Sequence, residues 1–388
     1  MKVCVIGGGP AGVFAAIHAK NTGAEVVLVE KNRHLLAKVK VSGGGRCNLA
    51  HACYDPYQLS QYYPRGAKEL LGPFHRFQTE NTVSWFSEHG IQLKTEDDGR
   101  IFPVTDSSET VVQCLLDQLT GVEILLGKKL KGIEKRGDEL FVHFEEASSI
   151  RCQKLILATG SDRDGYRLAE MFGHTIVKPV PSLFPLKIHP FLLKGLSGVV
   201  VDPVELKIQN IVQRGALLIT HFGFSGPVVL HLSAWAARYL AENEYRTELT
   251  VNWVPKVEVF QEFLSLKRQY PQKELSNLFS LPKGLWKYFI DRFDVKKRMN
   301  DIADTTLLRF GKHLQSDTYT VVGKSTHKGE FVTCGGISLK EVDMRTMQSK
   351  RCSGLYFAGE ILDIDGVTGG FNLQNAWTSG YLAGSTHL

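Results

Sequence analysis

Three glycines near the start of the chain, Gly7, Gly9 and Gly12, have the spacing of a phosphate-binding turn. Glycine permits a sharp turn and close approach of a phosphate, and the free N–H groups at the start of a helix attract negative charge. Glu30 follows 18 residues after Gly12, where a carboxylate accepts hydrogen bonds from ribose hydroxyls and disfavours a 2′-phosphate. With Pro10 and Ala11 completing the turn, these residues predict a dinucleotide site that fits FAD and NAD equally.

A second group of residues near the C-terminus separates the two dinucleotides. Glu360 and Asp363 follow the apolar run Leu355–Ala358, where a carboxylate can hold a ribityl hydroxyl. Gly369-Gly370 opens a segment rich in small residues that reaches Gly384, and its first amides suit the N1/O2 edge of a flavin. A reduced flavin is anionic there, so the helix dipole stabilises it by roughly 0.3–2 kcal/mol. The two ends of the chain together predict FAD.

The elements that must position these residues are strands of one parallel sheet. Apolar runs at 3–6, 26–29 and 154–158 are typical of buried strands, and the first enters the glycine turn and a helix with small side chains. Residues 130–133 and 140–144 flank a turn at Arg136–Glu139, which predicts a hairpin that returns to the sheet. The sequence therefore favours an α/β fold whose strand ends carry the site.

The middle of the chain has a different pattern. From 196 to 252, alternating apolar residues predict a small β unit, to which residues 321–336 return. Helical spacing runs from 256 to about 314, and its Phe and Trp residues are predicted to be core. We expect an FAD-binding domain at 1–187 and 336–388, an inserted β domain at 188–254 and 317–335, and a helical subdomain at 255–316.

Five short motifs give a more specific expectation. The chain resembles the HI0933-like family, also called BaiN-like NAD(P)/FAD-dependent oxidoreductases, in motifs that occur in the family's order: Ser42–Asn48, Gly99–Pro103, Thr220–Pro227, Thr333–Ile337 and Gly354–Gly384. The resemblance implies a glutathione-reductase-type FAD-binding Rossmann domain split by an inserted region. It also implies an unsettled substrate, because members include aminoacetone oxidases, reductases of unsaturated bile-acid intermediates, and reductases that turn a ribosomal RNA uridine into dihydrouridine.

Two segments depart from that family's pattern. The loop from Gly160 to Tyr166 is several residues shorter than usual, so the resemblance does not define how a substrate reaches the flavin. Leu49-Ala-His51 stands where the family tends to have Thr-Asn after the Arg-Cys-Asn motif. The residues predicted to contact FAD are Gly7, Gly9, Pro10, Ala11, Gly12, Glu30, Lys31, Lys40, Gly44, Arg46, Cys47, Leu130, Thr159, Gly160, Gly359, Glu360, Asp363, Gly369, Gly370, Phe371 and Asn372.

Flavin itself accepts and donates hydride, so the protein must mainly position the ring and supply a proton. His221 is a candidate proton donor, since an imidazole titrates near neutrality, or a histidine that bonds backbone in a turn. Arg100 is either a clamp for an anionic substrate or a structural donor. Cys47 is a third candidate, although a packed thiol is favoured over a nucleophile.

A disulfide reductase is the rival hypothesis for Cys47, with Cys53 as its partner. These two cysteines are separated by five residues where that class has four, and no second glycine fingerprint marks an NAD(P)H domain. The seven cysteines contain no CxxC pair, so we expect no metal.

Bulk composition indicates the surroundings in which this chemistry occurs. The odd cysteine count lacks a disulfide framework, which favours a reducing compartment. No apolar run approaches the about 18 residues of a membrane span, so we expect a cytoplasmic protein. The net charge of +6 permits RNA binding without requiring it.

We therefore predict an FAD-dependent reductase that takes hydride from NAD(P)H and passes it to a conjugated C=C or C=N bond. The acceptor is either a uridine in ribosomal RNA or a small enone or amino ketone. A flavin-bound RNA-binding or redox-sensing protein is the non-enzymatic alternative.

Overall fold

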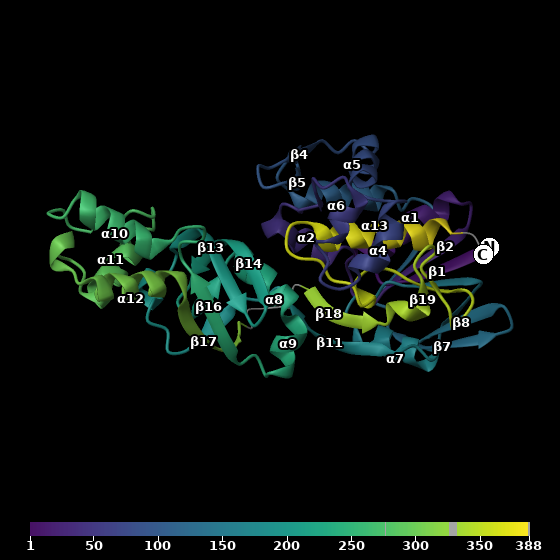
Figure 1. Cartoon of the computed structure of the whole chain (residues 1–388). Coiled ribbons are helices and arrows are strands. Elements are labelled where there is room, and N and C mark those ends of the chain that lie inside the picture. The colour runs from purple at the N-terminus through teal and green to yellow at the C-terminus, as the bar shows by residue number, and fades with distance from the viewer. Residues whose placement is uncertain (276, 326–331, 387–388) are drawn as a thin grey trace. The chain divides into compact units, whose positions relative to one another are not determined.

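A computed structural model describes residues 1–275, 277–325 and 332–386 of the chain. Its internal contacts divide it into two units, residues 1–180 with 332–388, and residues 181–331. Figure 1 shows both units, with many of their helices and strands labelled. Because the placement of one unit against the other is not determined, each is described by itself.

The first unit is built on a seven-stranded sheet. Its central strands are parallel and lie in the order β6 (Glu123–Leu126), β2 (Glu25–Glu30), β1 (Lys2–Ile6), β10 (Lys154–Leu157) and β21 (Leu355–Phe357). Two short antiparallel strands, β20 (Gln348–Ser349) and β19 (Val342–Asp343), extend the edge beyond β21. Ile6 lies opposite Val29 and Leu157, so the carboxyl ends of these strands are level. The α/β prediction with a parallel Rossmann-type sheet is confirmed.

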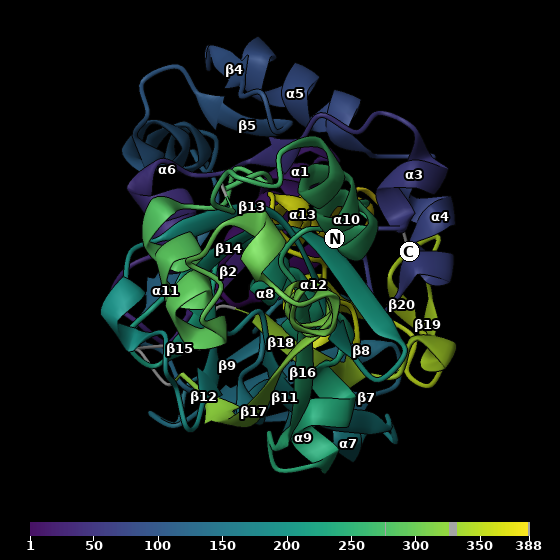
Figure 2. The same ribbon diagram turned by 60° about the vertical axis from the view of Figure 1, so that its left-hand side comes forward.

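Two helices from opposite ends of the chain pack together in this unit. Figures 1 and 2 show α1 (Pro10–Asn21) beside α13 (Phe371–Ser385). A Cβ atom at Gly380 would lie 2.6 Å from the carbonyl oxygen of Ala11, and one at Gly384 would lie 2.5 Å from that of Ala15. Backbones this close exclude any larger residue. The small residues of both helices therefore let the glycine turns at the two ends of the chain lie close together.

Shorter elements complete the first unit. The predicted hairpin is present as a three-stranded sheet, β7 (Leu130–Arg136), β8 (Glu139–Phe144) and β9 (Ser149–Cys152). The other sheets are β3 (Ala50–His51), β5 (Arg100–Pro103) and β4 (Leu93–Thr95), and the pair β11 (Ile176–Ser182) and β18 (Val332–Ile337). The remaining helices are α2 (Ala37–Val41), α3 (Pro56–Ser60), α4 (Ala67–Phe74), α5 (Thr79–Glu88), α6 (Ser108–Asp117) and α7 (Arg163–Met171).

The second unit contains a closed barrel. Its strands follow the order β12 (Leu186–Ile188), β15 (Gly223–Ser225), β14 (Ile211–Ile219), β13 (Val200–Ile208), β16 (Thr247–Asn252) and β17 (Asp317–Lys324). The helices of this unit are α8 (Pro227–Trp235), α9 (Ala237–Glu242), α10 (Val259–Gln269), α11 (Lys283–Phe293) and α12 (Asp304–Gln315). Phe263 and Phe289 are fully buried in the same core as the barrel residues, in agreement with the predicted apolar stripe. Closure removes the exposed sheet edges that an open β unit would have.

The limits of the two units differ slightly from those predicted. They fall at 180/181 and 331/332, whereas the sequence suggested 187/188 and 335/336. The predicted return of residues 321–336 is divided, since β17 joins the barrel and β18 pairs with β11. Residues 326–331 and 387–388, which two of the predicted domains include, lie outside the described residues. A separate helical subdomain at 255–316 remains a proposal.

Candidate functional site

The first glycine turn contains glycines with two different roles. Gly7 has φ of 110°, and its Cβ atom would lie 2.3 Å from the carbonyl oxygen of Ala158; a Cβ at Gly12 would lie 1.9 Å from that of Gly7. Gly9 precedes α1, whose first residues are Pro10 and the buried Ala11. A Cβ at Gly9 would meet no heavy atom within 4 Å among the described residues. Packing therefore explains Gly7 and Gly12, while Gly9 leaves the helix start open to a phosphate.

Glu30 ends β2 beside this turn. One carboxylate oxygen accepts a hydrogen bond from the Gly8 amide at 2.7 Å, and the other accepts one from the Asn32 amide at 2.8 Å. These bonds fix the carboxylate next to the start of α1. This is the position from which a carboxylate reaches the ribose of a dinucleotide. The neighbouring Lys31 forms an ion pair with Asp162.

The end of β10 supplies a third part of the same edge. The Thr159 hydroxyl and the nearby Tyr166 hydroxyl are buried without a hydrogen-bond partner in the described part of the chain. A buried polar atom without a partner is costly, so it marks a place where a ligand or water completes the bonding. Gly160 has φ of 62°, and a Cβ there would lie 3.6 Å from a carboxylate oxygen of Glu360. The hydroxyls of Thr159 and Tyr166 therefore fit a polar cofactor along this edge.

The C-terminal turn meets the first turn directly. Gly359 has φ of 77°, and a Cβ there would lie 2.7 Å from the Cβ of Ala11. Glu360 accepts a hydrogen bond from the Thr333 amide at 2.8 Å and forms an ion pair with Lys38, 322 residues away in sequence. The Asp363 amide donates to the Ile337 carbonyl at 3.0 Å, which holds the loop after β21. The predicted convergence of both chain ends is thus a feature of the fold.

The start of α13 is fixed by residues from the Arg-Cys-Asn segment. Gly370 has φ of 98°, and a Cβ there would lie 2.5 Å from the carbonyl oxygen of Ala50. With its amide oriented to suit its neighbours, Asn48 accepts from the Gly370 amide and donates to the Ala50 carbonyl, both at 3.0 Å. Asn372 closes the preceding loop through both polar groups of Gly366, at 2.8 and 2.9 Å. The sequence pattern does not identify Asn48 as a site residue, although Asn48 is the last residue of the Ser42–Asn48 motif.

Basic residues flank the glycine loop Ser42–Gly45, and their charges are partly neutralised within the protein. Lys40 pairs with Glu109 at 3.0 Å, and Arg46 pairs with Glu96 at 2.6 Å while its guanidinium lies 4.0 Å from the Phe102 ring centre. Gly44 has φ of 70° and faces open space within the described structure. The predicted contacts of Lys40, Gly44 and Arg46 with FAD, and that of Leu130 at the start of β7, remain predictions.

Cys47 is fully buried, and burial raises the pKa of its thiol to about 12. A thiol with such a pKa is protonated at neutral pH, which disfavours a nucleophile. All seven cysteines, every one of them in the described ranges, are free thiols. Packing explains Cys47 better than the rival disulfide chemistry does.

The other two catalytic candidates lie in different units. Arg100, on β5, pairs with Asp98 at 2.7 Å and Glu96 at 2.9 Å. His221 is exposed in the turn between β14 and β15 of the second unit. Their proposed roles remain predictions, and Arg100 has structural partners that account for its charge.

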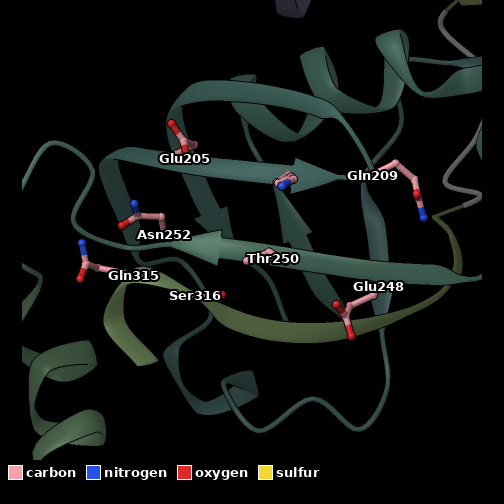
Figure 3. A pocket seen from close by; sticks show the side chains of 8 residues that line it. Glu205, Gln209, Glu248, Thr250, Asn252, Gln315 and Ser316 are labelled. Carbon is pink, nitrogen blue, oxygen red and sulfur yellow. The ribbon is translucent and has the colours of Figure 1, made fainter. Parts of the chain in front are cut away.

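A hollow of about 400 Å³ lies on the barrel of the second unit, and none of the residues that line it is a predicted flavin contact. Figure 3 shows its polar side chains along neighbouring strands. In the pairing of β13 with β16, Glu205 lies opposite Asn252 and Lys207 opposite Thr250. These are outward positions of strands whose alternate residues, such as Leu206 and Ile208, are buried. A solvated outer face explains this hollow.

Across the described ranges, no three His, Cys, Asp or Glu side chains gather as metal ligands would. Within the same ranges, no helix has the length and apolar character needed to cross a bilayer.

The glycine turn at β1, the acid at β2 and the glycine turn at α13 define a Rossmann-type flavoprotein oxidoreductase. The family described as "HI0933-like protein Rossmann domain" matches residues 1–386, and the chain belongs to this FAD-dependent family. The expected family and FAD cofactor are thereby confirmed.

Named relatives fall into two kinds. The chain is 29% identical over 400 residues to a ribosomal RNA dihydrouridine synthase of Escherichia coli strain K12, covering 97% of this chain and 95% of the relative. It is also 29% identical over 413 residues to a 3-dehydro-bile acid delta(4,6)-reductase of Clostridium scindens, covering 99% and 98%. Among solved structures, 3-ketosteroid-delta4-(5alpha)-dehydrogenase of Rhodococcus jostii covers 98% of this chain and 96% of its own, with 12% identity and a TM-score of 0.52. That likeness supports the fold alone.

Proposed function

We propose that the protein is a reductase that receives hydride from NAD(P)H at its flavin. It passes this hydride, together with a proton from water, to a conjugated C=C bond, with a uridine in ribosomal RNA as acceptor. The observation that carries the proposal is the meeting of the two chain ends, through Lys38 with Glu360 and Ala11 with Gly359. An extended dinucleotide needs both turns at one edge of the sheet.

The chain's residues have separate tasks in this reaction. Gly9 and the start of α1 bind the pyrophosphate, Glu30 binds a ribose, and Glu360 with Asp363 hold the ribityl chain. The start of α13, kept in place by Asn48, stabilises negative charge on the ring's N1/O2 edge. Bound FAD supplies the hydride chemistry.

The uridine acceptor is supported by the synthase relatives of Escherichia coli and Haemophilus influenzae, each 29% identical to this chain. A small-molecule enone reductase is the second candidate, because the Clostridium scindens reductase is equally similar. A cytoplasmic location is part of the proposal, since ribosomal RNA is found there.

Spectra of the purified protein test both steps. We expect bound FAD to bleach under anaerobic NADH or NADPH and to recover its colour when uridine-containing ribosomal RNA is added. RNA turnover should weaken steeply with salt, because phosphate contacts release counterions. Recovery with small enones alone, unaffected by salt, would instead favour the second candidate, and a protein that binds no FAD would end the proposal.

A further inference from the structure

An aromatic cluster lies against the start of α13, formed by His51, Tyr62 and Phe371. The rings of Tyr62 and Phe371 are nearly parallel, with centres 4.3 Å apart and planes at 12°. The His51 ring lies 4.7 Å from that of Phe371 and 5.7 Å from that of Tyr62. Phe371 is buried, whereas His51 is half-buried and Tyr62 is 36% exposed. The cluster therefore has a closed base and two rings that reach its surface.

Backbone contacts hold this cluster to the predicted flavin loop. The Val367 amide donates to the Tyr62 carbonyl at 2.9 Å, and the Tyr63 hydroxyl donates to the Phe371 carbonyl at 2.6 Å. Arg65 forms an ion pair with the fully buried Asp365. The segment from His51 to Arg65 is thus fastened to the turn that precedes α13.

The hydrogen bond of His51 fixes the chemistry of its free nitrogen. Nδ1 lies 3.2 Å from the carbonyl oxygen of Gly369. A carbonyl oxygen only accepts, so Nδ1 carries the proton and the neutral ring presents Nε2 as an acceptor. Burial lowers the pKa of His51, and the positive charge of Arg100 lowers it further, while Gly369 and Asp98 have smaller opposing effects. The net lowering favours this neutral ring at pH 7.

Within the described part of the protein, the hydrogen bond of the His51 ring is the one made by Nδ1, and Nε2 makes none. Gly99 lies beside it, and a Cβ atom at Gly99 would be 2.7 Å from Nε2. With φ of 84°, position 99 favours glycine in any case. A side chain at position 99 would therefore collide with Nε2.

We infer that His51, Tyr62 and Phe371 form the acceptor subsite and that His51 selects a ring bearing an imide N–H. A uracil ring presents N3–H between two carbonyl groups, and that N–H donates to Nε2 while the ring stacks against Tyr62. A steroid enone has no N–H donor to satisfy this nitrogen. The inference rests on the proposed reductase function and chooses between its two acceptors.

The test compares two nucleotides on the full-length, FAD-loaded protein. Uridine 5′-monophosphate and its 3-methyl derivative are titrated separately, by calorimetry and by the change they cause in the flavin's visible spectrum. We expect uridine monophosphate to bind at least about tenfold more tightly, since the methyl group removes the donor and leaves Nε2 unpaired. Equal affinity for the two, or no measurable binding of either at millimolar concentration, overturns the inference.

A variant assigns the preference to His51. His51→Phe keeps an aromatic ring but removes the acceptor, so uridine monophosphate and its 3-methyl derivative should bind with about equal affinity. The matched control His75→Phe alters an exposed histidine after α4 and should retain the full preference. Tyr62→Leu should weaken both nucleotides equally, while Tyr57→Leu, at a 62% exposed position, should not. A full preference in His51→Phe rejects the role of His51.

The outcomes separate this inference from the proposed function. A protein whose FAD is bleached by NADPH but which does not discriminate between the nucleotides keeps its function and loses the His51 assignment. If the protein binds no FAD, the proposed reductase function is rejected. Calorimetry with the two nucleotides then still measures whether His51 discriminates between them. If His51→Phe loses FAD on purification, the comparison on the unaltered protein decides.

Discussion

Two sets of buried polar side chains, one at the strand ends of the first unit and one in the barrel, differ in their hydrogen bonding. At the strand ends of the first unit, the hydroxyls of Thr159 and Tyr166 are buried without partners in the described chain. In the barrel, the buried Asp317 accepts a hydrogen bond from the Trp253 indole at 3.0 Å and another from the Tyr319 hydroxyl. The two hydroxyls at the strand ends are available to a bound molecule, whereas Asp317 is hydrogen-bonded within its own unit. Some substitutions should therefore change ligand binding without changing stability, and others should change stability without changing ligand binding, depending on where they lie.

The largest expected effect comes from the glycine turn. Gly12→Ala places a Cβ atom 1.9 Å from the Gly7 carbonyl oxygen, and we expect a loss of more than about 4 kcal/mol in unfolding free energy, or no folded protein. Denaturant unfolding followed by circular dichroism measures this loss.

Gly9→Ala is the matched control in the same turn, since its Cβ meets nothing within 4 Å in the described structure. It should fold normally and yet bind FAD more weakly, because the phosphate must approach the new methyl group. Equal stability losses in the two variants would contradict the division of roles within the turn.

A core substitution in the barrel should affect stability without affecting the flavin site. Phe224 is fully buried against Phe191 and Tyr319, with ring centres 5.3 and 4.9 Å away. Phe224→Ala should cost about 3–5 kcal/mol, and FAD absorbance should survive the unfolding of the barrel. Val212→Ala, at a 43% exposed position of β14, should cost little. Simultaneous loss of both signals would show that the units are not independent.

The sequence predicts the first unit better than the second for a physical reason. Turn glycines and a strand-end carboxylate have fixed spacings, so Gly7, Glu30 and Gly370 can be assigned from residue types and spacing alone. Barrel closure depends on pairing between distant strands, such as β12 with β17, and alternation alone does not report it. His51 escapes prediction as a site residue because its bond to Gly369 spans 318 residues.

Acid should weaken the first unit through His18. Burial lowers the pKa of this histidine to about 4, and its Nε2 has no partner in the described residues. The unfolded chain has the higher pKa, so stability is complete above about pH 6.5 and falls as the pH decreases towards 4. The loss is on the order of 2–3 kcal/mol. We expect His18→Leu to flatten the dependence of unfolding free energy on pH between 7 and 4.5, and exposed His75→Leu to leave it unchanged.

The smallest effect concerns affinity alone. Glu30 is half-buried and bonds the Gly8 amide at 2.7 Å, while Glu25, at the other end of β2, is exposed and pairs with Lys2. Glu30→Gln keeps the shape but removes the charge that strengthens bonds to ribose hydroxyls, so FAD should bind about tenfold more weakly, or about 1.4 kcal/mol. Flavin fluorescence on dilution measures the release. Glu25→Gln should leave FAD affinity unchanged, because a surface ion pair is worth little and lies at the opposite end of the strand. If both variants release FAD alike, the charge of the whole strand rather than its carboxyl end governs binding. The contrast between the strand ends, where a ligand binds, and Asp317, which is bonded within the barrel, then loses its clearest support.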